Sequence, residues 1–284
     1  MIQNVCICGG GTMGSGIAQV LAQHGYEIIV FDVMEMALQT SAQHIQTNFN
    51  HLVSTGKLSE SVAHQAFARI RFTDRINECA ADLIIEAIAE NLASKKELFQ
   101  QLAGLNSPET IFTTNTSSIR VSEIAEQMPH RERVAGLHFF NPAPVMKLVE
   151  VAATPYTSAG VIDKLVDLVQ KLGKQAVVCQ DVPGFIVNRV ARPYYLEALR
   201  LAEENAATLN EIDDLTESAG FRMGPFRLMD LIGNDVNLAV SQSLYEALGE
   251  PERLRPSTFQ QQKVDTGELG KKSGKGYYNY RQGG

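Results

Sequence analysis

The sequence predicts an α/β protein in which a mostly parallel β-sheet domain is followed by an all-helical C-terminal domain. Short apolar segments alternate with helix-like segments through residues 2–180, which is the pattern of consecutive β-α-β units. A glycine-rich turn joins the first apolar segment to the first helix-like segment. After Pro183 and Gly184 the strand-like segments stop, and the remaining chain has the apolar periodicity of helices.

The elements of the first domain can be assigned in order. Its predicted strands are apolar segments bounded by polar or glycine-containing turns. They cover residues 2–9, 26–32, 69–73, 81–89, 110–115, 133–140, 147–154 and 175–180. The predicted helices between them cover residues 12–25, 35–56, a stretch that ends near residue 69, 94–105 and 158–173.

The domain boundary is predicted near Val182, where strand-like segments give way to helices. The first domain then covers residues 1–182 and the second covers 183–284. Apolar periodicity predicts helices in the second domain at residues 185–205, 208–220 and 236–249.

Composition and charge narrow the classes of function. The chain of 284 residues carries a formal net charge of −7, which argues against nucleic-acid binding through bulk electrostatics. Its apolar runs are shorter than the ~20 residues that a membrane helix needs, and the N-terminus lacks the basic region of a signal peptide. The cysteines and histidines do not have metal-site spacing. We therefore expect a cytoplasmic protein that binds no metal, membrane or nucleic acid.

The segment "CGGGTMGSG" contains Gly9-x-Gly11-x-x-Gly14 between the first strand and the first helix. Glycines at these positions let the backbone approach a pyrophosphate, and the helix N-terminus donates N–H groups to it. The second strand ends at Asp32, 18 residues after Gly14 (32 − 14), where an acid accepts hydrogen bonds from an adenosine ribose. No arginine follows in "FDVMEM", so a Rossmann-type domain that binds NAD rather than NADP is predicted. A glycine turn without a ligand is the alternative.

Polar side chains follow three of the later strands. Asn115 ends the strand at 110–115 and Ser117 follows it, His138 and Asn141 lie at the end of the next, and Glu150 lies within an apolar strand. Ligands bind at the carboxyl ends of strands in open parallel sheets. A His–Glu pair there indicates a general base held in one tautomer, since imidazole gains and loses a proton near neutral pH. The alternatives are a hydrogen-bonded core histidine at His138 and a helix N-cap at Ser117.

Several segments, in order over nearly the whole chain, resemble the L-3-hydroxyacyl-CoA dehydrogenase family. They are "GGGTMGSGIA", "EAIAENLASKKELF", "NTSSI", "GLHFFNPAPVMKLVEV", "DVPGFIVNRV", "MGPFRLMDLIG" and "GKKSGKGYYNY". The resemblance implies that His138 takes the proton of the substrate 3-hydroxyl while a hydride passes from C3 to nicotinamide. It also implies that Glu150 stabilises the imidazolium, that Ser117 bonds the substrate oxygen and that Asn188 positions the acyl thioester.

The resemblance further implies the residues that contact each ligand. The NAD contacts would be Gly9, Gly11, Thr12, Met13, Gly14, Asp32, Glu90, Lys95, Asn115, Ser117, Asn141 and Lys272. Lys57, after the second helix, would contact a CoA phosphate. The C-terminal domain would bind substrate and form a homodimer.

The acyl chain is left open between 3-hydroxybutyryl-CoA and 3-hydroxyadipyl-CoA, and with it the pathway, fatty-acid metabolism or phenylacetate breakdown. A dicarboxylic chain would need a cation at its far end, for which Arg120, Arg222 and Arg227 are candidates. Two other functions are alternatives: a non-catalytic NAD-binding sensor, and a related dehydrogenase of hydroxy-acid sugars. Turnover of an acyl-CoA would distinguish them.

Overall fold

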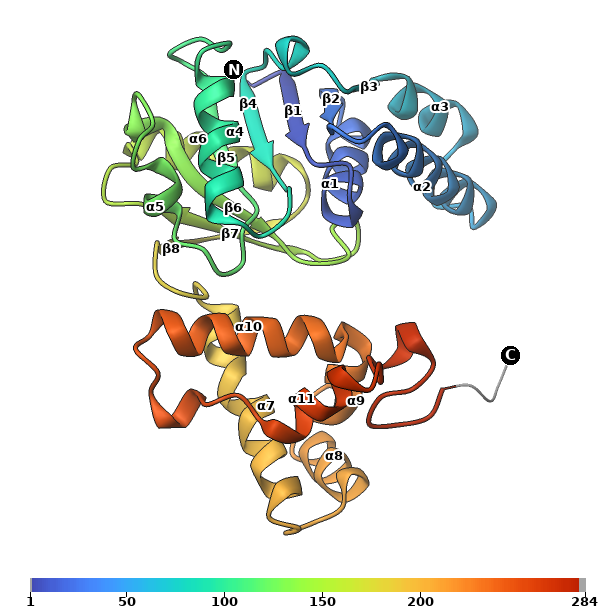
Figure 1. The fold of residues 1–284 in the computed structure, drawn as a ribbon. Coiled ribbons are helices and arrows are strands. Elements are labelled where there is room, and N and C mark those ends of the chain that lie inside the picture. Colours follow the sequence, from blue (N-terminus) through green and yellow to red (C-terminus); the bar gives the residue numbers. More distant parts are fainter. Residues whose placement is uncertain (1, 281–284) are drawn as a thin grey trace. The chain divides into compact units, whose positions relative to one another are not determined.

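A computed structural model describes residues 2–280 of the chain. The chain divides into two compact units, Met1–Val182 and Pro183–Gly284, each of which is considered by itself (Figure 1). Within residues 2–280, none of the helices combines the length and the apolar character needed to cross a lipid bilayer.

The first unit is built around one eight-stranded sheet with the strand order β3-β2-β1-β4-β5-β6-β7-β8. Its strands are β1 Asn4–Cys8, β2 Glu27–Phe31, β3 Ile70–Thr73, β4 Leu83–Glu86, β5 Ile111–Thr114, β6 Val134–Phe139, β7 Leu148–Ala153 and β8 Gln175–Gln180. Its helices are α1 Thr12–Gln23, α2 Glu35–Ser54, α3 Glu60–Ala68, α4 Leu92–Ala103, α5 Val121–Ala125 and α6 Ala159–Lys171. The predicted α/β class with a mostly parallel sheet is confirmed.

One pair of neighbouring strands, β6 and β7, is antiparallel, whereas all other pairs are parallel. The connection between them, residues 140–147, is too short for the crossover that a parallel pair requires. The antiparallel register places His138 directly opposite Glu150. Side chains of directly opposite residues lie on the same face of a sheet, so this register brings the two side chains together.

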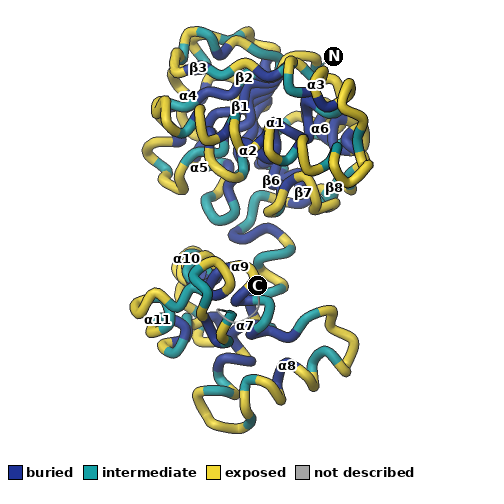
Figure 2. Tube along the Cα trace, turned by 90° about the vertical axis from the view of Figure 1, so that its right-hand side faces the viewer, coloured by how far each residue is buried: buried dark blue, intermediate teal, exposed yellow. Residues whose placement is uncertain are grey.

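The two faces of the sheet have different coverings. One face forms a core with α1, α2 and α6, to which β4 and β6 contribute residues such as Leu83, Ile85 and Leu137. The alternate residues of the same strands point to the other face, where Phe112 packs edge-on against Phe99 of α4 at 5.4 Å between ring centroids. Figure 2 shows the central strands, such as β1, as a buried layer and many exposed residues on the helices.

The second unit is helical. Its described residues contain single β-bridges between residues 270 and 279 but no extended β-strand. Its helices are α7 Val187–Glu203, α8 Leu209–Ser218, α9 Pro225–Ile232, α10 Asn234–Ala247 and α11 Thr258–Asp265. Leu199, Phe226 and Met229 lie in its core. The buried Asp230 carboxylate accepts hydrogen bonds from the backbone N–H groups of Tyr277 and Tyr278, which hold this segment against α9.

Candidate active site

The three motif glycines in the segment that follows β1 and opens α1 have different surroundings. Gly9 has φ +115°, and a Cβ there would lie 2.5 Å from the Ala87 carbonyl oxygen. A Cβ on Gly14 would lie 1.8 Å from the Gly9 carbonyl oxygen. A Cβ on Gly11 would meet nothing within 4 Å. The first and third glycines are therefore required by the protein's own backbone, whereas the second faces open space at the helix N-terminus, the kind of site that binds a pyrophosphate in other proteins. The contact of this loop with NAD stays a prediction.

Asp32 supports this loop from the end of β2. Its Oδ2 accepts the Gly10 N–H at 2.8 Å, and its Oδ1 accepts the Met34 N–H at 2.9 Å. Each carboxylate oxygen has a second lone pair, so these contacts are compatible with additional donors from a ribose. Thr12 is exposed and Met13 half-buried at the start of α1. Contacts of Asp32, Thr12 and Met13 with NAD stay predictions.

His138 and Glu150 form a buried pair across β6 and β7. His138 Nδ1 lies 2.8 Å from Glu150 Oε2, and the side chains are 7% and 1% exposed. An ionised carboxylate can only accept hydrogen bonds, so Nδ1 carries the proton and Nε2 is the basic nitrogen of the neutral ring. The Phe140 ring lies 4.5 Å from the imidazole, centroid to centroid. The arrangement can orient an imidazole and stabilise its charged form.

The loop after β5 lies beside this pair. Asn115 Oδ1 accepts the N–H of Phe139, the neighbour of His138, at 2.8 Å. The Ser117 N–H donates to Glu90 Oε1 at 3.2 Å. The alternative that Ser117 caps a helix is wrong, because α5 begins at Val121 and its N-cap is Arg120. Ser117 therefore lies outside helical structure, and its contact with a ligand stays a prediction.

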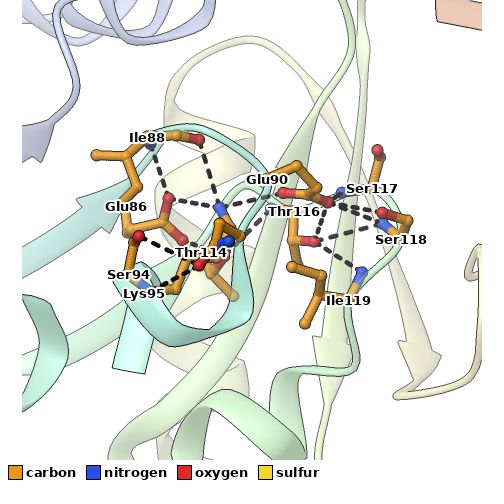
Figure 3. Close-up of polar contacts among 11 residues, drawn as sticks. Glu86, Ile88, Glu90, Ser94, Lys95, Thr114, Thr116, Ser117, Ser118 and Ile119 are labelled. Atoms are coloured by element: carbon orange, nitrogen blue, oxygen red, sulfur yellow. Dashed lines mark hydrogen bonds and ion pairs between the residues drawn. The ribbon is translucent and has the colours of Figure 1, made fainter. Parts of the chain in front are cut away.

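A buried ionic cluster lies under the same loop (Figure 3). Lys95 Nζ contacts Glu86 Oε1 at 2.6 Å and Glu90 Oε2 at 3.1 Å, and the Lys95 side chain is 1% exposed. Burial raises the pKa of Glu90, but the Lys95 ammonium and the hydroxyls of Thr116 and Ser118 outweigh it and hold that pKa below its ordinary value. In this structure Lys95 holds two carboxylates, and its contact with NAD stays a prediction, as does that of Glu90.

Sequence reasoning missed Glu86, which is completely buried at the end of β4. The signal was available, because Glu86 is a carboxylate inside the apolar segment "ADLIIEAIA". The same signal, a costly charge in an apolar strand, led to the prediction for Glu150. A buried carboxylate needs a partner for its charge. The partner of Glu86 is Lys95, nine residues later in α4.

The remaining predicted residues lie outside these clusters. Asn141 is exposed in the turn after β6, and Lys57 is exposed after α2. Asn188 lies in the first turn of α7 in the second unit. Lys272, also in the second unit, contacts Asp235 Oδ1 at 2.6 Å. The ligand contacts predicted for these residues stay predictions.

A parallel sheet with this glycine loop after its first strand, an acid at the end of the second and a buried His–Glu pair defines the class of NAD-dependent dehydrogenases. Residues 4–182 match the family model "3-hydroxyacyl-CoA dehydrogenase, NAD binding domain", and residues 184–280 match "3-hydroxyacyl-CoA dehydrogenase, C-terminal domain". The chain therefore belongs to the 3-hydroxyacyl-CoA dehydrogenase family. It is an oxidoreductase, and its cofactor is NAD.

Individual relatives agree with this assignment. The chain is 50% identical over 282 residues to a 3-hydroxyadipyl-CoA dehydrogenase of Escherichia coli (strain K12), covering 99% of the chain and 59% of that protein. It is 40% identical to the mitochondrial hydroxyacyl-coenzyme A dehydrogenase of Mus musculus, covering 99% of the chain and 92% of that protein. The structure of a 3-hydroxybutyryl-CoA dehydrogenase from Escherichia coli K12 superposes with a TM-score of 0.96 at 48% identity, covering 100% of the chain and 61% of that structure.

Proposed function

We propose that the chain oxidises (3S)-3-hydroxyacyl-CoA to 3-oxoacyl-CoA with His138 as the general base. The observation that carries the proposal is the buried contact of 2.8 Å between His138 Nδ1 and Glu150 Oε2. NAD, when bound, supplies the acceptor for the hydride that leaves C3 of the substrate. The alcohol proton must leave in the same reaction, so a base of this kind is required.

Each residue of the site has a defined task in this proposal. Nε2 of His138 takes the proton of the 3-hydroxyl, and Glu150 stabilises the resulting imidazolium through Nδ1–H. The Ser117 hydroxyl donates to the substrate oxygen, which fixes the hydroxyl next to the base. Asn188 positions the acyl thioester, and Lys57 contacts a CoA phosphate.

The test is NADH formation with a matched panel of 3-hydroxybutyryl-CoA, longer 3-hydroxyacyl-CoAs and 3-hydroxyadipyl-CoA. Turnover of at least one (3S) thioester, and none of its (3R) isomer, is the expected result. If NAD binds and no acyl-CoA is oxidised, the chain is a non-catalytic NAD-binding protein and the proposal fails. Oxidation of free hydroxy-acid sugars in place of thioesters would identify the third alternative.

For the acyl chain, we propose a short monocarboxylic or a dicarboxylic substrate. The relatives named for 3-hydroxyadipyl-CoA and 3-hydroxybutyryl-CoA support this pair. Arg227 contacts Asp214 at 2.8 Å and Glu217 at 3.0 Å, so its charge is already matched. Arg120 and Arg222 are exposed, with no ion pair to any described residue, and they are the better candidates for a distal carboxylate. Loss of a 3-hydroxyadipyl-CoA preference in Arg120→Gln or Arg222→Gln would identify the cation.

We also propose a homodimer formed through the C-terminal unit. Exposed apolar side chains on three of its helices support this: Val190 is 72% exposed, Leu215 67% and Leu231 50%. A partner that covers these apolar side chains removes them from water, which stabilises the dimer. Light scattering coupled to gel filtration tests the proposal. A single species of monomer mass at micromolar concentration would overturn it.

A further inference from the structure

Glu86 is a completely buried carboxylate to which the proposed mechanism gives no task. Its Oε1 accepts hydrogen bonds from Lys95 Nζ at 2.6 Å and from the Ile88 N–H at 2.7 Å. Its Oε2 accepts the Thr114 hydroxyl at 2.6 Å. The three donors come from α4, from the turn after β4 and from β5, so the carboxylate is held in one orientation by three parts of the fold.

A first set of contacts connects Glu86 to the loop after β5 through charged groups (Figure 3). The Lys95 ammonium lies between Glu86 and Glu90. Glu90 Oε1 in turn accepts the N–H groups of Ser117 and Ser118, each at 3.2 Å, and the Ser118 hydroxyl at 2.8 Å. The position of Lys95 therefore determines the position of the carboxylate that holds the backbone of the loop.

A second set of contacts reaches the same loop without Lys95. The Thr114 hydroxyl donates to Glu86 and accepts the Thr116 N–H at 3.2 Å. The Asn115 N–H donates to the Glu86 carbonyl oxygen at 2.7 Å. On its other side, Asn115 Oδ1 accepts the N–H of Phe139, next to the proposed base. The loop thus lies between the Glu86 cluster and the strand that carries His138.

The cluster consists of charged residues at a place where apolar side chains could also pack. A buried ion pair adds little stability relative to well-packed apolar side chains of the same size. Hydrogen bonds have direction, and apolar contacts do not, so the cluster can fix a loop geometry that apolar packing would leave variable. Misplacement of reacting groups by about 1 Å can lower a rate about a hundredfold.

We propose that Glu86 is a positioning residue of the dehydrogenase, which fixes the loop 115–118, and with it Ser117, through Lys95–Glu90 and through Thr114. This inference rests on the proposed function, in which Ser117 contacts the substrate oxygen. Glu86 touches neither substrate nor cofactor, and it acts through these two sets of contacts.

The main test is Glu86→Gln, which keeps the size of the side chain and removes its charge. At saturating NAD and acyl-CoA, kcat should fall about a hundredfold. Hydrogen exchange should accelerate at the amides of residues 115–118, whose partners are the Glu86 carbonyl oxygen, the Thr114 hydroxyl and the Glu90 carboxylate, and should stay at the wild-type rate in β2. A residue with a structural role alone would change exchange throughout the unit, or only lower the melting temperature, and would leave kcat unchanged.

The control is a second glutamate–lysine pair, whose lysine lies on the same helix and whose glutamate lies at the end of α5. Lys96, the neighbour of Lys95, contacts Glu126 at 2.8 Å, and the Glu126 side chain is 65% exposed. Glu126→Gln should leave kcat and the exchange of residues 115–118 at wild-type values. If Glu86→Gln does not fold, Thr114→Val takes its place, because it removes one hydroxyl and keeps every charge. Thr114→Val should change the same amides and lower kcat by a smaller factor.

Wild-type kcat together with wild-type exchange at residues 115–118 in Glu86→Gln, or in Thr114→Val if the first variant is unfolded, would overturn the inference. Failure of the proposed function gives a different result. In that case the wild-type protein itself does not oxidise any 3-hydroxyacyl-CoA, while the exchange experiment still reports whether Glu86 holds the loop.

Discussion

Two completely buried glutamates lie on the same face of the sheet and have partners of different chemistry. Glu86 on β4 contacts Lys95 at 2.6 Å, and Glu150 on β7 contacts His138 at 2.8 Å. A lysine ammonium has three donors and no acceptor, so it can donate hydrogen bonds to its carboxylates but cannot accept a proton. An imidazole can donate at one nitrogen while it accepts a proton at the other. In the proposed mechanism, one buried carboxylate therefore holds a loop and the other supports proton transfer.

Replacing the histidine of the second pair should have the largest effect. In His138→Gln, kcat should fall by about 10²- to 10⁴-fold, the contribution of a positioned general base. NAD binding, measured by calorimetry, should persist, because the glycine loop and Asp32 are unchanged. His64→Gln is the control, since His64 is exposed on α3. A His138 variant with near-normal kcat would remove His138 from the mechanism.

Glu150→Gln tests whether the second carboxylate works through charge. The amide can still accept the Nδ1–H of His138 but no longer stabilises an imidazolium, so kcat should fall about 10²-fold, near the lower limit for a general base. The rate should be compared with the thermal melting of the variant. Unfolding that accounts for the whole loss would make Glu150 a structural residue.

Asp230 in the second unit provides a third buried carboxylate, held by donors alone. It accepts the backbone N–H groups of Tyr277 and Tyr278 and the hydroxyl of Tyr280. Asp230→Asn puts an amide donor among these donors and should lower the free energy of unfolding by about 1–3 kcal/mol. Urea unfolding measures this loss. No change in the midpoint would show that apolar contacts, and not Asp230, hold residues 277–280 in place.

The smallest expected effect concerns pH and the exposed end of the Glu86 cluster. The pKa of Glu90 is held below its ordinary value by Lys95 and two hydroxyls, against the effect of burial. Its contribution to stability is therefore present above the ordinary carboxyl pKa and is lost as the pH falls through the lower pKa of the folded state. The free energy of unfolding, measured at a series of acidic pH values, should decline less steeply with falling pH for Glu90→Gln than for the wild type. Parallel curves for variant and wild type would contradict this.

The local sequence was sufficient to predict a feature of the site wherever all its residues lie close together along the chain. The segment from Gly9 to Gly14 follows β1 and opens α1 as predicted, because glycine spacing and the strand-to-helix change are both local signals. Asp32 directly follows β2, one residue beyond the end of the strand, for the same reason. The family and the NAD cofactor followed from motifs that run in order over the chain.

The sequence by itself thus determined the residue types of the site: the glycine loop, Asp32, His138 and Glu150. Only the tertiary structure decided which side chains meet. The antiparallel register of β6 and β7 places His138 opposite Glu150, and a shift by one residue would turn one of them to the other face. The Lys95 contact of Glu86 depends on where α4 packs on the sheet. Periodicity along a chain shows which residues are buried, whereas partners across strands and helices are set by register and packing.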